Sequence, residues 1–426
     1  MSQTISSRRG FLKAAALAGA LAAVGGCASL GGSKAKVVVI GGGYGGATLA
    51  RYLTLWGGGK IDVSLVERNP SFISCPMSNL VIAGYRKIED ITVSYDGLKA
   101  RGVRVIQGEV TGIDATARKV KLADGSELPY DRLVVSPGIE FMWNDVGGMA
   151  TAAAQEAIPH AWKAGTQTLL LQKQLMAMKD GGVFAISIPR APYRCPPGPY
   201  ERACLVADYL KKNKPKSKVL ILDANEDVVS KKGLFTKAWQ GTYGGMIEYR
   251  NNNELKEVDV ASRTAILEFD KVKADVLNVV PPQRAADIAR TAGLINVNNR
   301  WCDIDWLTME SKAVPNVHVL GDATFPAPTM PKSGHMANQQ AKLAAAALID
   351  LFDGKAPNAN PMLMNTCYSY VSEKQGIHVS SVHHYDAAKK TMLPVTGSGG
   401  VSVAASVIEG DFAAAWARNI WADSLS

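Results

Sequence analysis

The stretch KVVVIGGGYGGATLARYL, Lys36 to Leu53, decides the fold of this chain of 426 residues. Val37 to Ile40 form an uninterrupted apolar run, which predicts a strand buried on both faces of a parallel sheet. Gly41, Gly43 and Gly46 follow with the spacing G-x-G-x-x-G, and ATLARYL predicts a helix. The first glycine allows a tight turn, the second lets the backbone approach a pyrophosphate, and the third permits close packing of helix on strand. The stretch therefore predicts a dinucleotide site at a helix N-terminus.

Two later features indicate which dinucleotide this is. IDVSLVE forms a second predicted strand, and Glu67 at its end lies 26 residues after Gly41, where it is placed for ribose hydroxyls. VPNVHVLGDA is an apolar strand ending in Gly-Asp before a helical stretch, and it resembles the second FAD signature of flavoproteins with two dinucleotide-binding domains. In those proteins the aspartate, here Asp322, contacts the ribityl chain. RLVVSPGIEF, with Gly138, resembles their intermediate motif, so the cofactor is predicted to be FAD.

A second α/β unit begins with the strand GGVFAISI and continues with SKVLILDAN. In flavoproteins that accept hydride from a nicotinamide, the turn after this first strand carries glycines. Here that turn holds a single glycine, Gly198, among five prolines: Pro189, Pro192, Pro196, Pro197 and Pro199. Proline has no N–H to donate and fixes φ, so the loop cannot form an amide cradle for phosphates. The sequence thus argues against NADH as the electron donor.

Cys195 stands in this proline-rich turn. Pro199 suits the first turn of a helix, and YERACLVADYLKK continues it. A thiol just before a helix N-terminus is expected to have a lowered pKa, because the helix dipole favours thiolate. Glu201 lies within reach as a proton acceptor or donor. Cys204, one turn further among apolar residues, is expected to pack in the core.

The N-terminus resembles an export signal. SRRGFLK, Ser7 to Lys13, followed by AAALAGALAAV, resembles a twin-arginine signal, which predicts a periplasmic protein. VGGC resembles a lipoprotein cleavage box ending at Cys27; a lipid anchor there and ordinary cleavage nearby are both open. Loss of the three signal cations lowers the net charge from +9 to +6, a moderately basic surface that can steer an anionic substrate or an acidic partner.

Several segments together resemble one family, the flavoprotein subunit of flavocytochrome c sulfide dehydrogenase. They are RCPPGPYERA, YDGLKARGV, PHAWKAGTQT, ADVLNVVPPQRA, TMPKSGHMAN, NTCYS and WARNI. The resemblance implies a redox-active disulfide between Cys195 and Cys367 beside the flavin, with Glu201 as acid or base. It implies a tryptophan near the flavin at Trp416, with Trp421 unmatched, and a cofactor-binding place for Lys332. SCPMSN offers Cys75 for covalent attachment of the flavin; the alternative is a free thiol beside non-covalent FAD.

These features predict an α/β fold of two Rossmann-like domains, the second inserted in the first, plus a C-terminal region. The expected divisions are an export signal and linker, the first part of the FAD domain, a degenerate NAD-type domain, the second part of the FAD domain and a C-terminal interface region: 1–33, 34–141, 142–275, 276–355 and 356–426. No stretch after residue 35 is long and apolar enough for a membrane span.

The resemblance implies that the chain oxidises hydrosulfide through the cysteine pair and FAD, and passes electrons to a c-type cytochrome. The chain has no C-x-x-C-H motif, so the haem is expected on a partner chain in a heterodimer. No histidine spacing predicts a metal site, and no motif predicts nucleic-acid binding. Two alternatives remain: a sulfide:quinone oxidoreductase at the membrane surface, and a non-catalytic FAD-bearing partner subunit whose cysteines are structural.

Overall fold

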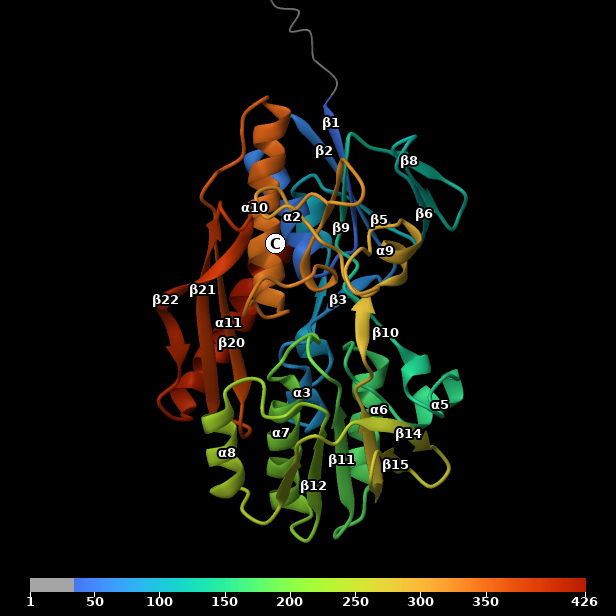
Figure 1. Ribbon diagram of the computed structural model, residues 1–426, viewed down its shortest axis with the longest axis vertical. Helices are drawn as coiled ribbons and strands as arrows, with labels where there is room; N and C mark the ends of the chain where they lie inside the picture. The colour runs from blue at the N-terminus through green and yellow to red at the C-terminus, as the bar shows by residue number, and fades with distance from the viewer. Residues whose placement is uncertain (1–33) are drawn as a thin grey trace, which may run out of the picture.

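The computed structural model describes residues 34–426 as two α/β units, one above the other in Figure 1, with an antiparallel sheet along one side. The twin-arginine motif and Cys27 lie in residues 1–33, outside the described residues.

The first unit is built on a parallel sheet of five strands in the order β19-β9-β1-β2-β5. These strands are β1 (Ala35–Ile40), β2 (Ile61–Glu67), β5 (Arg104–Gln107), β9 (Arg132–Val135) and β19 (Val317–Val319). The last four residues of β1 are buried, as the uninterrupted apolar run predicts. Helices α2 (Tyr44–Trp56) and α10 (Gly334–Phe352) pack against each other beside this sheet (Figure 1).

The second unit contains a four-stranded parallel sheet in the order β13-β12-β11-β17. Its strands are β11 (Val183–Ile188), β12 (Lys218–Asp223), β13 (Ile247–Arg250) and β17 (Val276–Val279). Its helices are α5 (Ala152–Ala157), α6 (Thr166–Ala177), α7 (Gly198–Asn213) and α8 (Lys232–Gln240). A small antiparallel sheet of β14 (Leu255–Asp259), β15 (Thr264–Leu267) and β16 (Lys271–Lys273) lies beside it. Parallel sheets in both units agree with the predicted fold class.

The chain leaves the first unit and returns to it through a pair of antiparallel strands. These are β10 (Ile139–Phe141) and β18 (Gln283–Ala285), in which Phe141 faces Gln283. The second unit is therefore inserted between two segments of the first.

The C-terminal part forms a three-stranded antiparallel sheet and a long helix. The strands are β20 (Met362–Tyr370), β21 (Gly376–Asp386) and β22 (Thr391–Val401), and the helix is α11 (Val407–Leu425). Strand β20 packs against both α10 and α7, so this sheet adjoins both α/β units, as Figure 1 shows.

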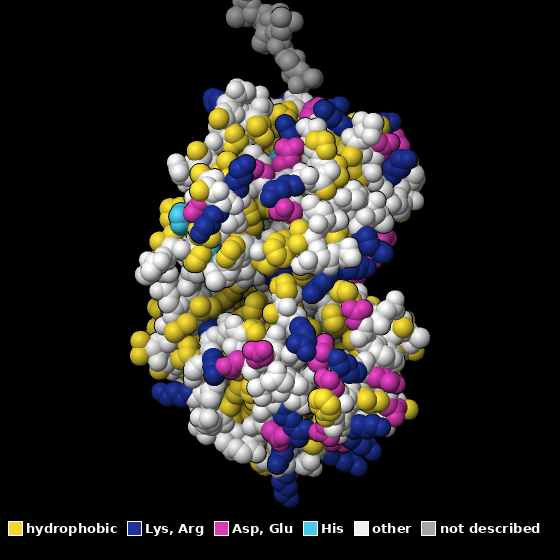
Figure 2. All heavy atoms as spheres, in the orientation of Figure 1, with side chains coloured by type: hydrophobic (Ala, Val, Ile, Leu, Met, Phe, Trp, Pro, Cys, Tyr) yellow, Lys and Arg dark blue, Asp and Glu magenta, His cyan; other side chains and the backbone are white. Residues whose placement is uncertain are grey.

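The remaining elements are short and belong mainly to the first unit. They are β3 (Ser71–Ile73), α3 (Ser78–Ile82), β4 (Thr92–Ser94), α4 (Asp96–Ala100), β6 (Val110–Asp114), β7 (Lys119–Leu122), β8 (Glu127–Pro129), α9 (Asp287–Thr291) and the single-turn helices η1 (Glu89–Ile91), η2 (Trp143–Asp145) and η3 (Gly321–Ala323). Between residues 34 and 426, no helix has the length and hydropathy needed to cross a membrane. Figure 2 shows basic and acidic side chains interspersed on one face, which is hollowed between the two units.

Candidate functional site

A cavity of about 620 Å³ lies where the two units meet the C-terminal sheet. Its walls come from the β1–α2 turn, the end of β2, the loop before α7, the start of α10, strand β20 and helix α11. Its volume is in the range of about 300–1,000 Å³ that is usual for small-molecule sites.

The glycine turn forms part of the cavity wall through Gly41 and Gly43. Gly41 has a φ of +95°, and a Cβ there would clash with the Ser136 carbonyl. A Cβ at Gly46 would clash with the carbonyl of Gly41, so Gly46 lets α2 sit close to the turn. At Gly43, by contrast, a Cβ would meet no protein atom within 4 Å. Bare backbone thus faces open space, as the approach of a pyrophosphate requires.

Glu67, at the end of β2, also lines the cavity. One carboxylate oxygen accepts the Gly42 N–H at 2.7 Å, and the other accepts the N–H and the side-chain amide of Asn69 at 2.8 and 2.7 Å. The carboxylate is therefore fixed beside the glycine turn, where ribose hydroxyls were expected.

The cavity wall also contains Asp322, from η3, and Gly138, which has a φ of +67°. The Oδ1 atom of Asp322 is buried and has no hydrogen-bond partner within the protein. Burial raises the pKa of this carboxyl, although Arg194 and Lys332 oppose the change. Helix α10 begins nearby at Gly334, also in the cavity wall. A free carboxylate oxygen, a helix N-terminus and the bare glycine turn fit the ribityl chain and pyrophosphate of FAD, which these residues would hold.

Cys195 stands in a backbone conformation that is rare for residues with a side chain, with a φ of +57°. Two hydrogen bonds hold it there: its N–H donates to the Lys332 carbonyl at 2.9 Å, and its carbonyl accepts the Gly198 N–H at 2.9 Å. A Cβ at Gly198 would lie 2.9 Å from the Cys195 sulfur, so only glycine leaves the thiol its place. These contacts hold Cys195 in an unfavourable backbone conformation in which its side chain lines the cavity.

Cys195 and Cys367 both line the cavity, and all five cysteines of residues 34–426 are free thiols in the structure. The prediction of a lowered pKa at Cys195 is wrong for the protein alone. Burial raises the pKa of this thiol, and the neighbouring Cys367 and Glu201 raise it further, whereas Arg194 lowers it. The removal of the thiol from water outweighs the helix dipole.

Glu201 reaches the same cavity from the first turn of α7. Its carboxylate accepts the Tyr370 N–H and the Asn79 side-chain amide, each at 2.9 Å. Burial raises the pKa of Glu201, while these two hydrogen bonds lower it, as do Lys231 and Arg202. The group therefore holds its proton to higher pH than an ordinary glutamate, as an acid or base beside a thiol requires.

Cys75 lies in the cavity wall opposite the start of α7. Arg194 Nη2 donates to its sulfur at 3.3 Å and also to the Trp162 carbonyl. The buried Nε of Arg194 has no partner within the protein. A guanidinium is thus held between the Cys75 and Cys195 sites.

Trp416 lines the cavity from α11, with its ring 6.2 Å from Tyr368 and 6.0 Å from His335. Trp421 does not line the cavity. Its indole N–H donates at 3.1 Å to the hydroxyl of Tyr44, and Tyr44 does line the cavity.

The Lys332 side chain faces away from the cavity. Its ammonium donates to the carbonyls of Asp322, at 2.9 Å, and Thr324, and lies 3.7 Å above the Trp301 ring. The lysine acts on the site in two ways: its charge opposes the raised pKa of Asp322, and its main-chain carbonyl holds the N–H of Cys195.

The structure adds three residues that the sequence analysis missed. Arg194 directly precedes Cys195 in the quoted segment RCPPGPYERA, so the sequence could have indicated it as a site residue. Asn79 ends the segment SCPMSN, but its contact with the distant Glu201 could not be read from that segment, and Lys231, which contacts the distant Cys367, lies in no quoted segment.

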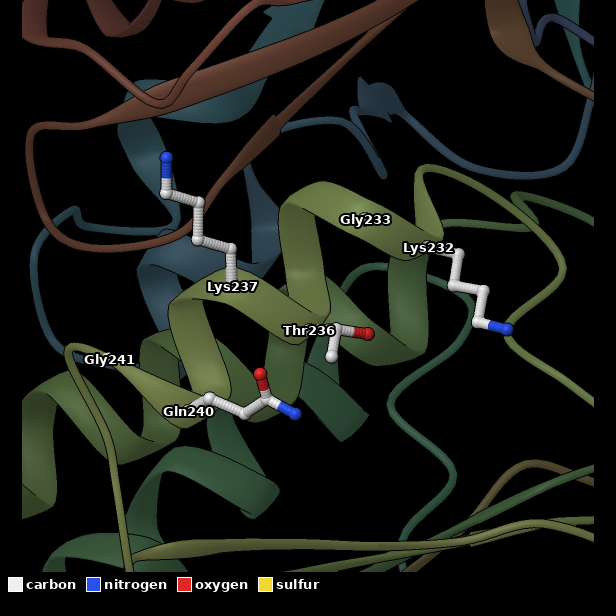
Figure 3. A pocket seen from close by; sticks show the side chains of 6 residues that line it. All are labelled: Lys232, Gly233, Thr236, Lys237, Gln240 and Gly241. Carbon is white, nitrogen blue, oxygen red and sulfur yellow. The ribbon is translucent and has the colours of Figure 1, made fainter.

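A separate hollow lies on α8, lined by side chains of that helix and its end (Figure 3). Lys232 in this hollow is paired with Asp227. The hollow contains no cysteine or carboxylate in its wall, so the chemistry of the chain is concentrated in the cavity described above.

Three family models match the chain. Residues 35–172 match pyridine nucleotide-disulphide oxidoreductase, residues 168–281 the central part of the sulfide dehydrogenase [flavocytochrome c] flavoprotein chain, and residues 359–425 flavocytochrome c sulphide dehydrogenase, flavin-binding.

Individual relatives agree with these matches. The sulfide dehydrogenase flavoprotein chain of Chlorobaculum thiosulfatiphilum is 50% identical over 46 residues, which cover 11% of this chain and 94% of that one. The mitochondrial sulfide:quinone oxidoreductase of Dictyostelium discoideum is 26% identical, over 84% of this chain and 82% of the relative. Among solved structures, the sulfide:quinone oxidoreductase of Aquifex aeolicus has a TM-score of 0.74 at 20% identity, over 92% of this chain and 91% of that one.

Fold and cavity together define a flavoprotein oxidoreductase with two dinucleotide-binding domains that binds FAD. Within that class, the chain belongs to the family of the flavocytochrome c sulfide dehydrogenase flavoprotein chain, which confirms the resemblance drawn from its sequence.

Proposed function

We propose that this chain is the flavoprotein subunit of a sulfide dehydrogenase, which oxidises hydrosulfide at Cys195 and Cys367 and passes the electrons through FAD to a c-type cytochrome. The observation that carries this proposal is that both thiols and Glu201 line the same cavity as the dinucleotide-binding glycines. The proline-rich loop before α7 lacks the amides that a nicotinamide dinucleotide would need, which supports electron entry through sulfur.

The chemistry follows from the residues present. In the oxidised pair, hydrosulfide attacks one sulfur of a Cys195–Cys367 disulfide; that S–S bond breaks, and a new S–S bond forms between the substrate and the attacked cysteine. The other cysteine leaves as a thiolate, which carries the negative charge that entered with hydrosulfide. Glu201 takes or returns a proton at its carboxyl oxygen. FAD, held by the glycine turn, Glu67 and Asp322, would supply the acceptor for the two electrons.

Cys75 is proposed to attach the flavin covalently. Its thiol lines the cavity, and its sulfur accepts a hydrogen bond from the Arg194 guanidinium at 3.3 Å, which fixes the sulfur in place.

A c-type cytochrome is proposed as the partner, consistent with the family. The surface near α11 supports partner binding, because apolar side chains follow one another there with at least half of their surface exposed: Val401, Val403, Val407, Ile408 and Phe412. The twin-arginine motif supports a periplasmic location, with the lipid anchor at Cys27 as an added proposal.

A sulfide:quinone oxidoreductase is the second candidate, since relatives with this name align over most of the chain. An acceptor comparison separates the two. After anaerobic reduction by sulfide, the proposal predicts rapid reoxidation by cytochrome c and slow reoxidation by a soluble ubiquinone analogue. The reverse order would assign the quinone activity instead.

A further inference from the structure

Lys231 is a buried lysine at the junction between α8 and β20. Its side chain is only 7% exposed, and its φ of +55° is unusual for a residue with a side chain. The ammonium donates to the Cys367 carbonyl at 2.9 Å and to the Ser369 hydroxyl at 2.8 Å. It thus joins the start of α8 to the strand that presents Cys367.

The charge of Lys231 has no fixed counter-ion. No carboxylate in residues 34–426 lies within ion-pair distance of its ammonium, and both hydrogen-bond acceptors are neutral. Burial lowers the pKa of Lys231 to about 8, although Cys367, Glu201, Cys195 and Glu409 all act to raise it. An unpaired buried cation is costly, and an anion formed beside it relieves that cost.

We propose that Lys231 is the positioning residue that stabilises the thiolate released when hydrosulfide opens the Cys195–Cys367 disulfide. This inference rests on the proposed function. Hydrosulfide brings one negative charge into the site, and bond exchange leaves that charge on a cysteine sulfur. The Lys231 ammonium supplies the matching positive charge and, through the Cys367 carbonyl, fixes the strand segment that carries this cysteine.

Other charged groups act on the same thiols. Arg194 lowers the pKa of Cys195 from the side of Cys75, and Glu201 raises it. Asn79 donates to Glu201 and is itself held by Arg202, whose charge lowers the pKa of Glu201. Glu409, on α11, raises the pKa of Lys231. Because Arg194 is already held by Cys75 and the Trp162 carbonyl, Lys231 is the cation available on the Cys367 side.

The experiment measures the thiols directly, without sulfide. Holoenzyme reduced with a phosphine is alkylated with iodoacetamide at a series of pH values that extends above the ordinary thiol pKa, and the labelling rates of the Cys195 and Cys367 peptides are measured by mass spectrometry. Lys231→Gln removes the charge but keeps a donor for the Cys367 carbonyl, Lys231→Met removes both, and Lys231→Arg keeps the charge. Lys237→Met is the matched control, since Lys237 is an exposed lysine on α8, the helix that Lys231 directly precedes (Figure 3).

In Lys231→Gln and Lys231→Met, the midpoint of alkylation is expected to rise by about one pH unit, so that labelling at fixed pH slows about tenfold. Lys231→Arg and Lys237→Met are expected to keep the wild-type profile. Wild-type profiles in both neutral variants would overturn the inference. If only one of the two neutral variants folds, a wild-type alkylation profile in that variant alone would overturn the inference.

The two proposals fail separately. A wild-type flavin that sulfide cannot reduce, together with shifted alkylation in the lysine variants, would overturn the proposed function and not the electrostatic role. Normal reduction by sulfide with unshifted alkylation would overturn the role of Lys231 alone.

Discussion

The guanidinium of Arg194 contacts the sulfur of Cys75 at 3.3 Å, although 119 positions of sequence separate the two residues. The next residue after Arg194 is Cys195, so one short loop serves both cysteine sites. The loop combines a donor to one sulfur with a backbone that fixes the other.

Removal of Cys75 is expected to abolish covalent attachment. In Cys75→Ser, FAD should be released into the supernatant by acid precipitation, whereas the wild-type pellet should keep its flavin absorbance. Arg194→Gln should lower the covalently bound fraction, because the Cys75 sulfur loses the guanidinium that holds it. Release of all the flavin from wild-type protein would show that FAD is bound without a covalent bond.

Replacing glycine by alanine at two positions of the glycine turn is expected to cause two different defects. Gly46→Ala inserts a methyl group against the Gly41 carbonyl and should lower the free energy of unfolding by about 1–3 kcal/mol, even without FAD. Gly43→Ala meets no protein atom within 4 Å, so it should leave the FAD-free protein as stable as wild type and weaken FAD binding. Thermal unfolding with and without FAD checks both, and equal losses without FAD would contradict the assignment of Gly43 to the cofactor.

Glu201→Gln is expected to slow flavin reduction by sulfide by about 10²- to 10⁴-fold, the usual contribution of an acid–base group. Stopped-flow absorbance measures this rate as a function of pH. Because burial raises the pKa of Glu201, the wild-type profile should contain a step above the ordinary glutamate pKa of 4.5, and the variant should lack that step. A step that persists in the variant would assign the titration to another group.

The same carboxyl affects stability with a definite sign. Between pH 4.5 and its raised folded pKa, the folded state holds a proton that the unfolded state has lost. The contribution of Glu201 to the free energy of unfolding therefore falls as pH rises through that interval. Denaturant titrations should show this fall in wild type and not in Glu201→Gln; identical slopes would contradict the buried placement.

Asn79→Ala is expected to destabilise the protein by removing a hydrogen bond that holds Glu201 in place. The Asn79 amide donates to one carboxylate oxygen of Glu201 at 2.9 Å and accepts from the Nε of the buried Arg202 at 3.0 Å, so its loss leaves these two atoms without their hydrogen-bond partner. A cost of about 1–3 kcal/mol is expected in chemical denaturation. Asn213→Ala, at the exposed end of α7, serves as the control and should cost far less. A double-mutant cycle with Glu201→Gln should show coupling between the two sites, and strict additivity would contradict this arrangement.

The sequence predicted the parts of the site that local patterns encode. The strand, glycine turn and helix around Gly41 are one continuous segment, and the proline-rich loop around Cys195 is another, so their shapes followed from local chemistry. Lys231 and Asn79 could not be found in this way, because their roles depend on distant segments brought together by the fold. The pKa of Cys195 was predicted with the wrong sign for a related reason: sequence places the thiol near a helix end but does not reveal how far burial removes it from water.

The most direct test of the account is anaerobic titration of the flavin absorbance with sulfide in wild type, Cys195→Ser, Cys367→Ser and Cys204→Ser. Cys204 is fully buried beside Trp239 and serves as the control thiol. The account predicts stoichiometric bleaching in wild type and Cys204→Ser, and its loss in both other variants. Full sulfide-dependent bleaching in Cys195→Ser and Cys367→Ser would contradict it and indicate a flavoprotein whose cysteines are structural.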